Sequence, residues 1–221
     1  MKKILQRTTL ALAAAGAIAT GLTGCFPLAV GGAVVTGMVA TDRRTTGAVV
    51  EDEGIELRAG NRIREVLGER GHVDVTSYNR QVLLTGEVPS AQDRAQVEQI
   101  VAGVDNVRHI INELAVLGNS TFNQRSSDAL VSGRVKASLV DAQDLSANAF
   151  KIVTERGTVY VMGRVTAREA KRATEVIAGV SGVQKVVRIL ETVTEEELAR
   201  MVTPPAKTSE DKQRGERSKG D

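Results

Sequence analysis

The residue types that build disulfides, metal centres and nucleophilic sites are scarce, because the 221-residue chain has one cysteine and two histidines. A lone cysteine excludes an internal disulfide framework. Neither His72 nor His109 has a neighbour at the spacing of metal ligands. The phosphate-binding patterns G-x-G-x-x-G and G-x-x-x-x-G-K are missing as well. We therefore expect no enzyme active site, no metal and no cofactor, and two partly exposed structural histidines.

Large aromatic side chains are also rare, since the chain has no tryptophan, two tyrosines and three phenylalanines. Aliphatic residues must therefore build its cores, and a hydrophobic content of 42% allows this. The formal net charge of +2 includes Lys2, Lys3 and Arg7 at the extreme N-terminus. Without these three residues the charge is −1, which does not support nucleic acid binding.

The N-terminus has the pattern of a targeting segment. The basic residues are followed by an apolar stretch, 8–22, that is short for a membrane span. Leu22-Thr-Gly-Cys25 then resembles the lipobox of bacterial lipoproteins, in which the cysteine is acylated. Phe26, in place of aspartate, indicates the outer membrane by analogy with lipoprotein sorting. We expect a signal peptide over 1–24 and lipidation of Cys25; an ordinary signal peptide, or a membrane anchor with an incidental cysteine, is the alternative.

After the cysteine, residues 26–40 are apolar, small and rich in glycine. A second membrane span is one interpretation, but so much glycine over fifteen residues favours a tether close to the bilayer surface. We assign 25–51 to the lipidated cysteine and this tether. Asp42-Arg-Arg-Thr-Thr-Gly47 opens the soluble part of the chain.

The soluble part contains an internal repeat. Segment 82–88 shares two valines and a glycine with segment 159–165, at an offset of 77 positions. The match resumes between 102–104 and 178–180 at an offset of 76. The lost residue falls in a predicted turn, where a fold tolerates a deletion. The chain is therefore two copies of one module.

Each copy follows the order helix, strand, strand, helix, strand. The second helix of each begins with capping-box-like residues, at Ser90 and Thr166, and ends at a glycine, Gly103 or Gly179. We expect the glycines inside the hairpin strands, Gly86 and Gly163, to allow close approach of another backbone. The predicted segments are 55–67, 73–78, 81–88, 91–102 and 107–116, and then 128–140, 149–155, 158–165, a helix opened by 166–169, and 183–193. The start of 107–116 fits helical spacing equally well.

This order, with a glycine in the second strand and the entries Asp105-Asn-Val107 and Ser181-Gly-Val183 to the third, resembles the BON domain. Together with the lipobox and the tether, the chain is similar to dual-BON outer-membrane lipoproteins. The resemblance implies an α+β fold of two tandem αββαβ domains, each a small three-stranded mixed sheet with helices on one face. It also implies periplasmic exposure, binding of anionic phospholipid by the second domain, and a role in envelope integrity near division sites. The expected parts are a first domain at 52–117, a linker at 118–125, a second domain at 126–193, and a short helix with a disordered tail at 194–221.

The two copies differ in net charge. Residues 52–117 hold seven basic and eleven acidic side chains, whereas residues 126–192 hold ten basic and seven acidic ones. An anionic membrane would attract the second copy at about 1 kcal/mol per well-placed Lys or Arg. Two helices carry the candidate phospholipid-binding residues: Leu130, Arg134 and Lys136 in the first, and Arg168, Lys171 and Arg172 in the second. Solvated helix faces are the alternative, and the absence of an aromatic residue near Leu130 favours electrostatic docking over shallow insertion.

Two competing interpretations place the function elsewhere. The chain is either a protein-interaction adaptor that adds a sheet edge to an envelope machine such as the outer-membrane barrel assembly proteins, or a structural spacer. In each case we expect a monomer that does not bind nucleic acid.

Overall fold

The structure is a computed structural model, and it describes residues 42–202. The predicted signal peptide, the lipidation of Cys25, the tether up to residue 41 and the tail from residue 203 lie outside the described residues. None of the helices within 42–202 combines the length and the apolar character that a membrane span requires.

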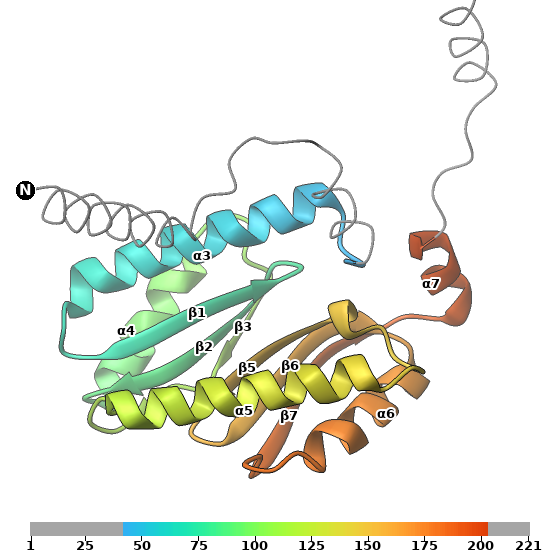
Figure 1. Cartoon of the computed structure of the whole chain (residues 1–221). Helices are drawn as coiled ribbons and strands as arrows, with labels where there is room; N and C mark the ends of the chain where they lie inside the picture. Colours follow the sequence, from blue (N-terminus) through green and yellow to red (C-terminus); the bar gives the residue numbers. More distant parts are fainter. Residues whose placement is uncertain (1–41, 203–221) are drawn as a thin grey trace, which may run out of the picture. The chain divides into compact units, whose positions relative to one another are not determined.

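The first domain contains a sheet covered by helices on one face (Figure 1). The strands β1 and β2 form an antiparallel hairpin, and the chain then crosses over through α4 so that β3 and β4 lie parallel to β2. The third predicted strand is thus split in two. The elements are α3 (Thr46–Leu67), β1 (His72–Tyr78), β2 (Gln81–Val88), α4 (Ala91–Ala102), β3 (His109–Asn112) and β4 (Ala115–Val116).

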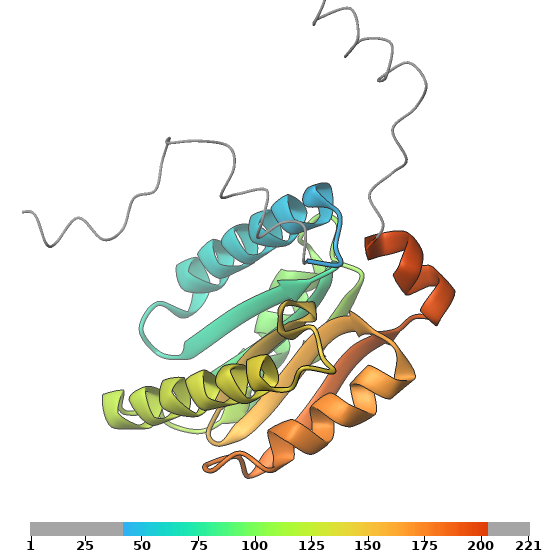
Figure 2. The same cartoon turned by 45° about the vertical axis from the view of Figure 1, so that its right-hand side comes forward.

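The second domain repeats this order, with its sheet arranged β5-β6-β7 and α5 and α6 on one face (Figures 1 and 2). The strand β7 lies parallel to β6 over its whole length. The elements are α5 (Phe122–Asp141), η1 (Ala147–Ala149), β5 (Phe150–Glu155), β6 (Thr158–Val165), α6 (Ala167–Ala178) and β7 (Lys185–Thr192), followed by α7 (Glu195–Val202). The predicted α+β fold of two tandem domains, each with a small mixed sheet and helices on one face, is confirmed.

Two helices begin earlier than the periodicity predicted. The helix α3 starts at Thr46 instead of 55, inside the stretch assigned to the tether, because Thr45 caps it through the Ala48 amide. The helix α5 starts at Phe122 instead of 128, inside the predicted linker, where Thr121 and Gln124 form a full capping box. The early part of α5 carries too few apolar residues for the stripe to be recognised, whereas α3 has three consecutive apolar residues near its start, 48–50, that do not show helical spacing. Both cap residues were visible in the sequence.

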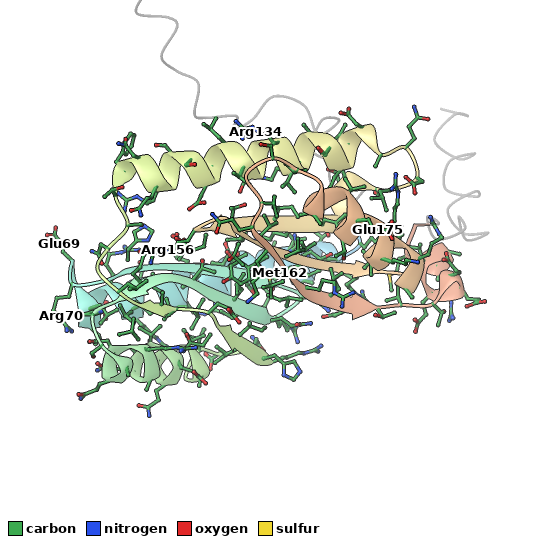
Figure 3. The ribbon with its side chains drawn as sticks, turned by 90° about the horizontal axis from the view of Figure 1, so that it is seen from below. Glu69, Arg70, Arg134, Arg156, Met162 and Glu175 are labelled. Carbon is green, nitrogen blue, oxygen red and sulfur yellow. The ribbon has the colours of Figure 1, made fainter. Side chains whose placement is uncertain are left out.

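Alternation along the strands builds three apolar cores. Side chains on one face of each sheet, such as Val82 and Leu84 of β2 or Val159 and Val161 of β6, pack beneath the helices of their own domain. The side chains between them point to the opposite face. There a third cluster forms from both domains, with Tyr78, Leu83, Tyr160 and Met162 at its centre. The two sheets therefore cover each other's second face, and Figure 3 shows Met162 between them.

Gly86 of β2 and Gly163 of β6 lie where the neighbouring backbone comes very close to the strand. Gly163 pairs with Phe150, and a Cβ atom at Gly163 would lie 2.5 Å from the Ala149 carbonyl oxygen. A Cβ atom at Gly86 would overlap the carbonyl oxygen of His72, and Gly86 has a φ of 106°. The prediction that these glycines permit close backbone approach is confirmed.

Candidate lipid-binding surface and the segment that joins the domains

The helix α5 buries one stripe and exposes another. Its inward stripe, Val131, Val135 and Leu139, is almost fully buried against the second-domain core, as the spacing predicted. Phe122 and Val140 are 18 residues apart, which is five turns at 3.6 residues per turn, so both lie on the outer side. Their exposed fractions are 75% and 68%, and Leu130 is 63% exposed.

Small residues fill the space between these three apolar side chains. By helical geometry Ala129, Gly133 and Ala137 lie on the same outer side, and all three are exposed. We call the set of Phe122, Ala129, Leu130, Gly133, Ala137 and Val140 the outer stripe. The outer stripe faces solvent, while the core of the domain lies on the opposite side of α5. Exposed apolar side chains in this position are typical of a helix that contacts a membrane surface.

Cations border the outer stripe on both sides. The helical angles place Arg134 along one edge of it, and Arg125 and Lys136 along the other, and all three are exposed. One guanidinium nitrogen of Arg134 donates to the Ser181 carbonyl at 3.3 Å, which leaves its remaining donors for other partners. The structure thus brings together the three residues predicted on this helix, Leu130, Arg134 and Lys136, on or beside the outer stripe.

The three cations predicted on the other helix form a separate group. Arg168, Lys171 and Arg172 are exposed in the first turns of α6, which lies next to α5 on the same face of the sheet (Figures 1 and 2). Arg172 is paired with Asp144 at 3.1 Å, in an ion pair about half exposed to solvent. No apolar stripe accompanies them, because α6 buries Ala173 and Ile177 inward. They add positive charge beside α5 and do not form a second apolar contact.

A cavity lies at the C-terminal end of α5. Its volume is about 560 Å³, and Lys136 and Val140 of α5 line it together with Arg44, Tyr78 and residues of β5. Arg44 and Lys151, which also lines it, are already paired with acidic side chains. Lys136, the third cation that lines the cavity, is exposed to solvent.

The two histidines differ in their surroundings. His109 is exposed at the start of β3, whereas His72 is partly buried and lies 3.9 Å from Asp74. Within residues 42–202, His, Cys, Asp and Glu side chains form no group of three that could hold a metal ion.

Two consecutive arginines just before α3 reach both domains. Arg43 donates to both carboxylate oxygens of Glu169 at 2.7 and 2.8 Å and to the Arg164 carbonyl at 3.0 Å, all in the second domain. Burial alone would raise the pKa of Glu169, but the hydrogen bonds from Arg43 and Thr166 outweigh it and hold that pKa below its usual value. Because Glu169 also accepts from the Thr166 amide, Arg43 is attached directly to the cap of α6.

The neighbouring arginine holds the first domain. Arg44 donates to Asp42 and to Asp52 of α3, both at 2.7 Å, and its guanidinium stacks 4.4 Å from the centre of the Tyr78 ring. Asp52 in turn accepts from the Ser77 hydroxyl and from the backbone amides of the β1–β2 turn. Residues 42–44, which we call the clasp, therefore connect the two domains.

Residues 56–118 and 127–193 each match the BON domain family. With a matching fold in both copies, the chain belongs to this family and contains two BON domains in tandem. The clasp and the first turns of both α3 and α5 lie outside the matched ranges.

Comparison with curated proteins finds relatives that align with two thirds or more of this chain. The chain is 34% identical over 170 residues to the outer membrane lipoprotein DolP of Haemophilus influenzae, which covers 76% of this chain and 88% of that protein. It is 30% identical over 151 residues to the 21 kDa hemolysin of Actinobacillus pleuropneumoniae, which covers 67% of this chain and 78% of the relative. The chain is thus a dual BON-domain protein similar to DolP.

Two of the three large apolar side chains of the outer stripe were missed by sequence reasoning. Phe122 and Val140 were not considered, because α5 was started at residue 128 and Val140 was taken as its last residue. The signal for Phe122 was the pattern Thr121-x-x-Gln124, which marks the helix start directly before it. The clasp could not be found, because ion pairs between segments more than one hundred residues apart leave no local pattern.

Proposed function

We propose that this chain is a non-enzymatic outer-membrane lipoprotein, anchored through acylated Cys25 and facing the periplasm, that maintains envelope integrity near division sites. In this proposal its second BON domain binds anionic phospholipid through the outer stripe of α5 and the cations beside it. The observation that carries the proposal is the stripe itself, three large apolar side chains exposed by 63–75% and bordered by Arg125, Arg134 and Lys136.

The contributions of the cations and of the apolar side chains have the size expected for a protein that binds the membrane surface without spanning it. Each cation near an anionic surface contributes about 1 kcal/mol, and full burial of a Leu, Val or Phe side chain contributes about 1.5–3 kcal/mol. Phe122 supplies the aromatic residue whose absence near Leu130 had disfavoured shallow insertion. A contact of this size prolongs and orients binding, while several acyl chains on Cys25 would provide stable residence.

The packing of the domains also favours a helix as the contact. The second face of each sheet is covered by the other sheet through the cluster around Leu83 and Met162. A ligand therefore meets helices or sheet edges first. Among the exposed large apolar residues, α5 and α3 contribute three each. The helix α5 has three basic and two acidic residues, whereas α3 has three basic and five acidic ones, so charge favours α5 at an anionic surface.

Polar substitution in the outer stripe is expected to weaken membrane binding. A chain from Asp42 onward with Phe122→Ser and Leu130→Ser should bind anionic vesicles at least about 10-fold more weakly than the unsubstituted chain, because two apolar contacts are lost. The measurement is co-sedimentation with vesicles of a zwitterionic lipid, with and without an anionic lipid.

The matched control carries Val50→Ser and Leu57→Ser on α3, which are 64% and 65% exposed. It should bind like the unsubstituted chain. Equal binding by all three proteins would show that the outer stripe does not enter the membrane. Equal losses in both variants would mean that general apolar exposure, and not α5, causes the binding.

One observation favours the adaptor as a second candidate. The strand β7 is eight residues long and, among the described strands, pairs with β6 alone, so its other edge is open to strand addition. Lipid docking through surface charge weakens steeply with ionic strength, whereas backbone pairing does not. A partner that binds with salt-independent affinity, and is lost when proline replaces a residue in β7, would favour the adaptor.

A further inference from the structure

Buried polar atoms without a hydrogen bond gather at one end of the contact between the domains. Glu87 of β2 is fully buried, and its Oε1 atom has no hydrogen bond within the described residues. The same holds for Oε1 of Glu155 and for Nη1 of Arg156 at the β5–β6 turn. Figure 3 shows Arg156 between α5 and the strands of the first domain.

Strand alternation explains why these groups meet. Leu83 and Glu87 point from β2 into the domain contact, and Val153 and Glu155 point into it from β5. The guanidinium of Arg156 lies 3.5 Å from the Glu87 carboxylate, which is close enough for an ion pair but not for a hydrogen bond. Arg156 therefore lies beside the fully buried Glu87 carboxylate of the first domain and next in sequence to the partly buried Glu155 of the second.

Carboxylates from three other elements act on Glu155. Burial of the side chain raises the pKa of Glu155, and the carboxylates of Glu87, Asp128 and Asp74 raise it further, to about 7. The guanidinium of Arg156 acts in the opposite direction. The charged and titratable groups that face this end are His72 and Asp74 of β1, Glu87 of β2, Asp128 of α5, Arg156 of the turn and Tyr160 of β6.

We propose that Glu87 and Glu155 form a proton-sensitive contact between the two BON domains, which is closed when Glu155 carries a proton and loosened when Glu155 is ionised. A protonated Glu155 adds no charge beside the Glu87 carboxylate, so Arg156 balances one negative group. An ionised Glu155 adds a second negative charge near the fully buried Glu87 carboxylate, and like charges repel more strongly in a partly buried site than in water.

The contact also reaches the start of α5. The Oε2 atom of Glu87 accepts from the Ser120 amide at 3.1 Å, directly before the N-cap Thr121. Asp128 of α5 accepts from the Arg156 and Gly157 amides at 2.8 and 2.9 Å. We therefore expect a loosened contact to affect the beginning of α5, because Ser120 lies two residues before Phe122.

The sign of the pH dependence follows from the direction of the shift. An ordinary glutamate titrates near 4.5, so between about pH 4.5 and 7 the folded chain holds a proton that the unfolded chain has lost. The free energy of unfolding falls as the pH rises through this window and becomes constant above it. Asp42, Asp93 and Glu169 have lowered pKa values, so their contributions change only at lower pH.

The test compares the thermal midpoints of the full chain in detergent at pH 5.5 and pH 8. The unsubstituted chain should lose about 3 °C or more on going to pH 8. Glu155→Gln should remove most of this difference, while Glu175→Gln, an exposed glutamate on α6, should retain it. Equal pH dependence in the unsubstituted chain and in Glu155→Gln would overturn the proposal.

A second measurement needs no variant. Amide hydrogen exchange of the unsubstituted chain, corrected for the intrinsic effect of pH, should accelerate at pH 8 around residues 72–74, 85–87 and 154–158. Exchange around the clasp end of the contact, at Tyr78 and Lys151, should not change. Uniform acceleration, or none, would contradict a contact localised at Glu87 and Glu155. Neither measurement involves lipid, so its outcome is independent of the membrane proposal.

Discussion

Replacing Glu169 with glutamine is expected to lower the free energy of unfolding by about 3–5 kcal/mol, the usual effect of removing one partner of a buried ion pair. Arg43 and Glu169 are 8% and 4% exposed, and two hydrogen bonds of 2.7 and 2.8 Å join them. The substitution leaves the guanidinium of Arg43 buried without a counter-charge. Urea denaturation of the chain from Asp42 onward, followed by circular dichroism, measures the change.

Two controls separate this buried pair from ordinary surface charge. Changing Arg172 to methionine breaks a pair with Asp144 that is about half exposed, and should cost about 1 kcal/mol or less. Combining Arg43→Met with Glu169→Met removes both buried charges and should restore much of the stability lost in Glu169→Gln. If Glu169→Gln costs no more than Arg172→Met, the clasp does not hold the second domain.

Replacing Gly86 with alanine is expected to cost roughly 3 kcal/mol or more, through a backbone clash and a strained φ angle. The new Cβ atom would overlap the carbonyl oxygen of His72, which is part of the β1–β2 ladder and cannot move independently. Gly86 also has a φ of 106°, which alanine adopts only with strain. The midpoint and the slope of urea denaturation measure this loss of stability.

The control for Gly86→Ala is Gly133→Ala, a glycine-to-alanine change on the outer stripe. No atom lies within 4 Å of the position of its Cβ, and alanine favours a helix over glycine by about 1 kcal/mol. This variant should therefore be at least as stable as the unsubstituted chain. A Gly86→Ala protein with unchanged stability would mean that β1 and β2 do not approach as closely as the structure has them.

The repeat and the cap residues predicted most of the fold. The offset between segments 82–88 and 159–165 placed equivalent strands, and Ser90 and Thr166 marked the starts of α4 and α6 correctly. The contact between the sheets could not be predicted, because the structure buries both faces of β2, and alternation along a strand does not show what covers the second face. The early start of α5 was hidden by the polar residues 123–127, whereas α3 has the apolar residues 48–50 near its start, and these were assigned to the tether.

The candidate site was predictable only in part. Leu130 was singled out because it departs from the inward stripe of Val131, Val135 and Leu139, and the structure exposes it. Arg168, Lys171 and Arg172 were chosen from charge alone, and charge does not tell whether apolar contacts accompany a cation. The carboxylates that act on Glu155 come from three separate elements, so its environment required the tertiary structure.

The measurement that tests the account most directly is co-sedimentation of the chain from Asp42 onward with anionic vesicles at low and high salt. It is made beside a variant with Arg134→Glu and Lys136→Glu on α5, and a control with Arg64→Glu and Arg108→Glu, exposed cations of the first domain. We predict salt-sensitive binding that the α5 variant loses and the control retains. Equal binding by all three proteins, or binding that does not change with salt, would contradict lipid recognition by the second BON domain.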